Sequence, residues 1–248
     1  MKSFMPNNLL LAMLLSVTSQ AMASNHAHWE YSGDKGPENW GALSDEFSVC
    51  ASGKNQSPVN LTRMVEGELP ELLMQYRAGG HEVVNNGHTV QINYAAGDSI
   101  TVNGKKFELK QFHFHAPSEN TIDGKSFPME AHFVHADKAG NLAVLAVMFE
   151  QGRPSAELEK AWSNMPQKAG NKVSLGNKVD ANALLPQDHA YYRFNGSLTT
   201  PPCSEGVSWF VMKQSVEASK DQIAKFSRTM SHANNRPVQP LNARMVIK

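Results

Sequence analysis

Short β-prone runs broken by turn residues dominate this chain and constrain its fold most strongly. The stretch 82–92 (EVVNNGHTVQI) places an Asn-Gly pair between two such runs, and 99–109 (SITVNGKKFEL) repeats the arrangement. Asn-Gly is favoured in two-residue β-hairpin turns, because both turn residues there adopt positive φ. The runs 141–150 (NLAVLAVMFE) and 207–212 (VSWFVM) also predict strands, and the first has the continuous apolar character of a strand buried on both faces.

Helical patterns are fewer and shorter. Segment 154–165 begins with proline and spaces Leu158 and Trp162 four apart, which predicts a surface helix that packs one stripe. Ser219 and Gln222 resemble a capping box at the start of another helix. No internal repeat or low-complexity linker divides the sequence. We therefore expect one mainly β domain, with a large, twisted, mostly antiparallel sheet and a few short peripheral helices.

The first 23 residues have the pattern of a secretory signal peptide: Lys2, an apolar stretch at 9–17, and the small-residue sequence 21–23 (AMA). The apolar stretch is short for a permanent transmembrane helix. We expect export, removal of residues 1–23, and a mature domain at 24–248 of 248 − 23 = 225 residues. That length is within the range of single β-rich domains.

Charge and cysteine content narrow the choice of partners and compartment. Lys and Arg total 23 against 23 Asp and Glu, so loss of Lys2 leaves 22 − 23 = −1. This balance argues against nucleic acid or an anionic membrane as the main partner, since both require a basic face. The two cysteines, Cys50 and Cys203, would meet an oxidising compartment after export. We expect a disulfide that closes a loop of about 150 residues; two buried free thiols are the alternative.

The stretch 111–119 (QFHFHAPSE) carries two histidines inside an apolar run. Because strand side chains alternate between faces, Gln111, His113 and His115 share one face, and Phe112 and Phe114 share the other. An H-x-H pair by itself is more typical of ordinary hydrogen-bonded histidines than of metal ligands.

A second segment, 129–137 (MEAHFVHAD), changes that interpretation. Read as a strand, it places His132 on one face with Glu130 and Val134, and His135 on the opposite face, where we interpret it as a packed residue. If the two strands pair, His132 joins the other two imidazoles.

Three imidazoles with an open fourth position are the arrangement of a catalytic zinc site, whereas a structural site fills all four positions with protein. His113, His115 and His132 are therefore candidate zinc ligands. Gln111 and Glu130 are candidate acceptors that would fix the imidazole tautomers and ring orientations.

At this point the chain resembles the alpha-class carbonic anhydrases. The likeness covers essentially the whole mature sequence, and the alanine-proline after His115 and the two cysteines are similar to the bacterial or plant branch. The motifs that carry it are HWEYSG (28–33), NQSPVN (55–60), NNGH (85–88), QFHFHAPSE (111–119), MEAHFVH (129–135), AVLAV (143–147), GSLTTPPCSEGVSW (196–209) and NNRPVQPLN (234–242).

The resemblance implies an exported Zn²⁺ enzyme, placed in the bacterial periplasm, that reversibly hydrates carbon dioxide to bicarbonate and a proton. Its ligands would be His113, His115 and His132, and its nucleophile a zinc-bound hydroxide, for which this family is the general example. Thr199 would accept a hydrogen bond from that hydroxide and donate its own to Glu119, a positioning effect.

The resemblance also implies a substrate pocket, which includes the Thr200 hydroxyl, and a proton route. His88 would carry the proton between the site and bulk solvent, since its unperturbed pKa near 6.5 suits both directions. Tyr31, Asn86 and Gln91 would hold the intervening waters. The apolar wall of the pocket would comprise Val134, Val144, Leu198, Val207 and Trp209.

The sequence departs from the family pattern at Asn120 and Phe194, where histidine and tyrosine are common, and we expect this to affect stability more than activity. Ser57-Pro58 and Pro201-Pro202 are the candidate cis peptide bonds by resemblance. Besides the carbon dioxide enzyme, a non-catalytic binding module on the same fold and a zinc esterase are alternatives, and weak ester hydrolysis is an expected side activity. We expect small molecules as the binding partners and either a monomer or a homodimer as the oligomeric state.

Overall fold

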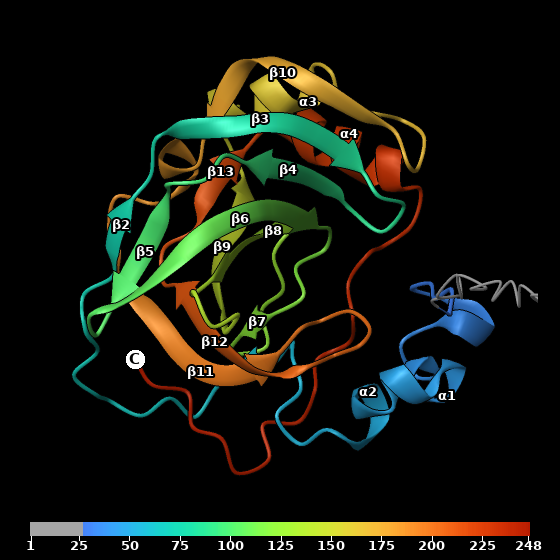
Figure 1. Cartoon of the computed structure of the whole chain (residues 1–248), viewed down its shortest axis with the longest axis vertical. Helices are drawn as coiled ribbons and strands as arrows, with labels where there is room; N and C mark the ends of the chain where they lie inside the picture. The colour runs from blue at the N-terminus through green and yellow to red at the C-terminus, as the bar shows by residue number, and fades with distance from the viewer. Residues whose placement is uncertain (1–26) are drawn as a thin grey trace, which may run out of the picture.

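The computed structural model describes residues 27–248, so the expected signal peptide at 1–23 lies outside the described residues. Figure 1 shows a strongly curved sheet, with the first helices at one side of it. The strands are β1 (Asn60–Leu61), β2 (Leu73–Gln75), β3 (Ala78–Asn85), β4 (Val90–Tyr94), β5 (Ser99–Val102), β6 (Lys105–His115), β7 (Thr121–Ile122), β8 (Met129–Ala136), β9 (Leu142–Gln151), β10 (Lys172–Asp180), β11 (Tyr191–Ser197), β12 (Glu205–Met212) and β13 (Val216–Ala218). The helices are α1 (Trp40–Leu43), α2 (Val49–Ser52), α3 (Ala156–Trp162) and α4 (Lys220–Met230), with 3₁₀ turns at Gly33–Lys35, Asp45–Phe47 and Asn182–Leu184.

One 11-stranded sheet forms the body of the molecule, in the order β10-β3-β4-β6-β8-β9-β12-β11, with β2, β5 and β13 attached at its sides. All its pairings are antiparallel except those of β12 and β13 with β9. The short strands β1 and β7 form a separate parallel pair. The expected mainly β, mostly antiparallel fold is confirmed. None of the described helices is both long and apolar enough to cross a bilayer.

Both predicted hairpins are present. β3 and β4 flank the Asn86-Gly87 turn, and β5 and β6 are joined by Asn103 and Gly104. The latter two have φ of 50° and 72°, the left-handed conformation that a two-residue turn of this kind requires. The long strand β6 thereby runs back through the middle of the sheet.

Apolar side chains cover both faces of the sheet, and β9 shows the division most clearly. Leu145, Val147 and Phe149 belong to the larger core with α3 and α4, whereas Val144 and Met148 belong to a second core on the opposite face. β9 is therefore buried on both faces, as its continuous apolar run predicts.

The helices differ in part from expectation. α4 begins with the predicted capping box, in which the Ser219 hydroxyl accepts from Gln222 N and the Gln222 side chain accepts from Ser219 N. The predicted start of α3 at Pro154 is wrong: Ser155 is its N-cap, because its hydroxyl accepts from Leu158 N.

The N-terminal segment that carries α1 and α2 was not predicted. It packs through an aromatic cluster that includes Tyr31, Trp40 and Phe47, and Cys50 of α2 joins Cys203 there in a disulfide across 153 residues. The disulfide confirms the expectation from export and cysteine count. It ties α2 to the loop between β11 and β12.

Candidate metal centre

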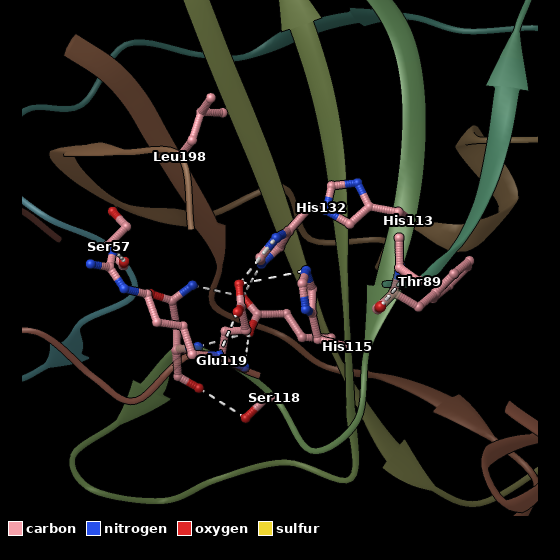
Figure 2. A network of polar contacts seen from close by, with 12 residues as sticks. Ser57, Thr89, His113, His115, Ser118, Glu119, His132 and Leu198 are labelled. Carbon is pink, nitrogen blue, oxygen red and sulfur yellow. Dashed lines mark hydrogen bonds and ion pairs between the residues drawn. The ribbon is translucent and has the colours of Figure 1, made fainter. Parts of the chain in front are cut away.

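Three histidines meet on one face of two adjacent central strands. In the antiparallel register of β6 and β8, His113 lies directly opposite His132, and His115 lies opposite Glu130. The ring centroids are 4.6–5.4 Å apart, and one nitrogen from each ring lies within 4.8 Å of the others. Figure 2 shows the three rings turned toward a common point. Strand alternation and register are thus sufficient to gather the predicted set.

Hydrogen bonds fix two of the rings from outside. His113 Nδ1 lies 2.9 Å from Gln111 Oε1, and His115 Nδ1 lies 2.7 Å from the carbonyl oxygen of Asn234. Each Nδ1 therefore carries the proton, and each Nε2 is left as a lone-pair donor facing the common point. His115 Nε2 is buried and has no hydrogen-bond partner among the described residues.

The third ring is held by Glu130. Glu130 Oε1 lies 2.9 Å from His132 Nε2, although this contact is not aligned as a hydrogen bond. Because Nε2 faces Glu130, Nδ1 is the nitrogen of His132 that faces the other two rings. The same carboxylate accepts from Glu119 N at 2.7 Å, Asn120 N at 2.8 Å and Asn120 Nδ2 at 2.7 Å. Burial raises the pKa of Glu130 to about 6, while the Asn120 donors oppose the rise.

The ligand set fits a zinc ion. Burial lowers the pKa of all three imidazoles, and neighbouring histidines lower those of His113 and His132 further. All three are therefore neutral near pH 7, the state that a metal ligand must have. Three neutral imidazoles with oriented outer nitrogens, and an orphaned buried Nε2 at the centre, are what a zinc site with an open position requires.

Glu119 lies directly beside this centre (Figure 2). Its Oε2 is 3.5 Å from His115 Nε2 and 3.8 Å from His132 Nδ1, and its Oε1 accepts from Arg236 N at 2.8 Å. Burial raises the pKa of Glu119 to about 8; the Arg236 N–H and the Thr199 hydroxyl both act to lower it. A cation held by the histidines would favour the ionised carboxylate further.

The loop between β11 and β12 presents Thr199 and Thr200. Leu198 N donates to the Ser204 carbonyl at 3.0 Å and Cys203 N donates to the Thr200 carbonyl at 2.8 Å. Cys203 also carries the disulfide, so both ends of this loop are fixed. The peptide bonds Ser57-Pro58 and Pro201-Pro202 are cis, as the resemblance suggested, and Ala116-Pro117 is a third.

A cavity of about 150 Å³ opens onto two of the metal-site histidines, His113 and His115. The structure brings Tyr31, Asn86, His88, Gln91 and Thr200 together in its lining, along with Trp29, Thr89 and Gln111. A larger hollow of about 780 Å³ lies between β9, β13 and α3 and has no histidine in its lining. The small cavity is the one associated with the metal centre.

His88 sits half-buried at this cavity, stacked on Trp29 with ring centroids 3.7 Å apart and an interplanar angle of 13°. Burial lowers its pKa, and His28 and His232 lower it further, while Glu30 acts in the opposite direction. His28, Trp29 and Glu30 belong to the sequence motif 28–33, but the motif assigns no role to these side chains, and His232 lies outside the motifs.

The five apolar residues expected beside the substrate lie together in the second core. Val144, Val207 and Trp209 are buried, while Val134 and Leu198 are half-buried against that core. The Trp209 ring meets the His132 ring edge-on, with centroids 4.9 Å apart. The described lining of the small cavity includes none of the five.

His135 packs away from the centre, as strand alternation predicts. It is fully buried, with Nε2 2.6 Å from the Tyr76 hydroxyl and Nδ1 3.3 Å from the Ala143 carbonyl. Burial lowers its pKa to about 4. This residue is therefore a neutral core histidine.

The two departures at Asn120 and Phe194 are accommodated by local contacts. Asn120 Nδ2 donates to Glu130, and Asn120 Oδ1 accepts from Val59 N at 3.0 Å, so both polar atoms of its side chain are hydrogen-bonded. Phe194 stacks on Trp209 at an interplanar angle of 9°. Neither substitution leaves a visible unpaired partner in the part of the chain that the structure describes.

Two further residues that support the site were missed. Asn234 and Arg236 are fully buried in the irregular segment after α4, more than a hundred residues from the groups they hold. The Arg236 guanidinium donates to Gln56 Oε1 and to the carbonyls of Ser57 and Cys50. The sequence motif 234–242 marks this segment but assigns no role to these side chains.

Comparison with known proteins identifies the family. The family model for eukaryotic-type carbonic anhydrase matches residues 35–248. A carbonic anhydrase of Neisseria gonorrhoeae is 53% identical over 243 residues, which are 97% of this chain and 96% of that protein. One from Klebsiella pneumoniae is 48% identical over 246 residues, covering 98% and 100%.

A solved structure agrees with the sequence comparisons. The alpha-carbonic anhydrase from Thermovibrio ammonificans, in complex with the inhibitor sulfanilamide, is 52% identical and superposes with a TM-score of 0.89, covering 90% of this chain and 100% of that one. The histidine cluster and the fold are both in keeping with this match. The chain belongs to the alpha-carbonic anhydrases, the family of zinc lyases that interconvert carbon dioxide and bicarbonate.

Proposed function

We propose that this chain hydrates carbon dioxide at the centre formed by His113, His115 and His132, which would hold Zn²⁺. The observation that carries the proposal is the convergence of three neutral imidazoles: the outer nitrogens of His113 and His115 are hydrogen-bonded, and that of His132 faces the Glu130 carboxylate. When bound, zinc supplies Lewis acidity, which makes water nucleophilic at neutral pH.

Glu119 and Thr199 would orient the attacking oxygen. Glu119 is held on one side by Arg236 N, and its carboxylate also faces the Thr199 hydroxyl, whose proton it would accept. With its proton committed in this way, Thr199 Oγ1 can only accept a hydrogen bond from the nucleophile. This arrangement positions a lone pair toward the carbon of the substrate.

Carbon dioxide has no charge, so an apolar surface would bind it best. Val134 and Leu198 are half-buried beside the second core, and Val144, Val207 and Trp209 support them from within it. Thr200 adds a hydroxyl to the cavity. A site of this size would admit other small carbonyl compounds, and slow hydrolysis of activated esters would accompany the main reaction.

His88 would return the proton to solvent. It shares a cavity with His113 and His115, and Tyr31, Asn86 and Gln91 line the space where bridging waters would lie. Burial and its histidine neighbours keep the pKa of its imidazole below 6.5, so His88 is neutral and able to accept a proton at pH 7.

We also propose that residues 1–23 direct export and are removed, and that the mature chain 24–248 works in the bacterial periplasm. The supporting observations are the leader pattern, the Cys50–Cys203 disulfide and the bacterial carbonic anhydrases among the relatives.

Two matched substitutions test the metal assignment. His115→Gln removes a proposed ligand, and His135→Gln is the control because His135 is an equally buried histidine on the opposite face. Metal content by atomic emission and carbon dioxide hydration by stopped flow are measured on both. We expect His115→Gln to lose stoichiometric zinc and hydration and His135→Gln to retain both. Full zinc and hydration in His115→Gln would overturn the assignment.

A further inference from the structure

The loop that carries His88 is not held to the ligand strand by backbone pairing. The ladder between β4 and β6 runs from Asn93↔Gln111 to Gln91↔His113 and ends there. Residues 86–89 lie beyond that point, next to the stretch of β6 that carries the second ligand, His115. The direct links between the His88 loop and this end of β6 are therefore made by side chains.

The Asn234 side chain makes that connection. Its Nδ2 donates to the His88 carbonyl at 3.0 Å and to the Phe114 carbonyl at 2.9 Å, and its Oδ1 accepts from Ala116 N at 2.9 Å. Phe114 and Ala116 flank His115 in the sequence. One fully buried amide, with both donors and its oxygen engaged, thus joins the His88 loop to the backbone on either side of a ligand.

A second contact holds the loop one residue further on. The Thr89 hydroxyl donates to the Phe114 carbonyl at 2.6 Å, and Figure 2 shows Thr89 beside His113 and His115. Thr89 anchors the start of β4, whereas the Asn234 amide contacts the His88 carbonyl itself. The His88 ring is meanwhile stacked on Trp29.

We infer that the Asn234 side chain is a positioning residue for proton transfer, which fixes the His88 imidazole at a set place relative to His115. The inference rests on the shuttle role proposed for His88. Small displacements of a reacting group are costly, because proton transfer through a short water path depends on orientation. The backbone carbonyl of Asn234, which orients His115, is kept when only the side chain is changed.

That separation of side chain and backbone provides the test. Asn234→Ala removes all three side-chain contacts, and Asn234→Ser keeps a polar atom near the Ala116 N–H but is one bond too short to replace the amide. Asn235→Ala is the matched control, because Asn235 is the neighbouring amide and has no side-chain hydrogen bond among the described residues. The zinc-loaded variants are compared by stopped flow, with and without imidazole buffer.

We expect both Asn234 variants to lower kcat about three- to tenfold, short of the loss in His88→Ala, with kcat/KM near wild type. The split arises because returning the proton to solvent enters kcat, whereas the steps up to bicarbonate release determine kcat/KM. Imidazole should restore part of kcat. In the His88→Ala background, Asn234→Ala should have no further effect on kcat, and Asn235→Ala should behave as wild type.

A second readout is independent of activity. The Trp29 ring should shift the proton resonances of the stacked His88 imidazole upfield, and we expect this shift to shrink in both Asn234 variants.

If His88→Ala lowers kcat while both Asn234 variants keep the wild-type kcat and resonances, the inference is wrong. Equal losses in kcat and kcat/KM without imidazole rescue would also overturn it. If His88→Ala leaves kcat unchanged, the shuttle role proposed for His88 is wrong instead. The His88 resonances then still test whether the Asn234 side chain positions the His88 ring. If Asn234→Ala does not fold, the kcat and the His88 resonances of Asn234→Ser test the inference.

Discussion

Removing the Cys50–Cys203 disulfide should destabilise the protein by an amount that the structure allows us to estimate. The bridge closes a loop across 153 residues. The chain-entropy relation −2.1 − 1.5R ln n then gives about −17 cal/mol/K, or about 5 kcal/mol at 25 °C. Because this contribution acts on the unfolded chain, the loss should appear in the free energy of unfolding more than in the folded site.

Urea unfolding of the mature chain, with the Cys50–Cys203 disulfide intact and after its reduction, measures this loss. The two samples have the same amino-acid sequence, so the oxidised protein is the control for the reduced one. With a denaturant slope of about 2.5 kcal/mol/M, the midpoint should fall by about 2 M. Carbon dioxide hydration without urea should change less than about twofold, since the Cys203 N–H bond to the Thr200 carbonyl and the Leu198 N–H bond to Ser204 remain. A Cys50→Ala/Cys203→Ala variant should match the reduced protein. A midpoint shift below about 0.5 M would refute the loop-closure reasoning.

Three other predictions test the proton route, the substrate wall and the core. His88→Ala should lower kcat by about tenfold or more, because it removes the proton acceptor, and imidazole buffer should restore part of it in stopped-flow assays. Val134→Tyr should cut turnover while zinc content stays stoichiometric, because the larger ring fills the space beside His132. His135 titrates near 4 when folded against 6.5 when unfolded, so the unfolded state binds more protons between these values and stability falls as pH drops from 6.5 to 4, by about 3 kcal/mol. His135→Gln should flatten that part of the stability curve measured by urea unfolding.

Each of these has a result that would contradict it. Unchanged kcat in His88→Ala, together with no effect of imidazole, would mean that protons leave by another route. Full turnover in Val134→Tyr would remove Val134 from the substrate wall. If His135→Gln loses as much stability as wild type between pH 6.5 and 4, the acid sensitivity arises elsewhere.

The sequence predicted the elements that obey a simple period. Alternation placed His113 and His115 on one face of β6 and His132 on the matching face of β8, and the observed pairing brings them together. It also placed His135 correctly in the core. These inferences succeed because side-chain direction in a strand depends only on residue parity and register.

Other parts depend on tertiary contacts that no local pattern reveals. The helices α1 and α2 have four residues each, too few for a periodic signal, and are stabilised by the aromatic cluster around Trp40. Asn234 and Arg236 act from an irregular segment on groups more than a hundred residues away. The start of α3 was misplaced because the Ser155 cap outweighs the preference of proline for a first helical position.

The most direct test of the central claim is carbon dioxide hydration by the mature, disulfide-intact chain, measured by stopped flow across pH before zinc removal, after it, and after zinc is restored. We expect hydration that disappears with the metal, returns with it, and rises through an apparent pKa near 7. A folded, zinc-loaded protein without hydration activity, or hydration that survives zinc removal, would contradict it.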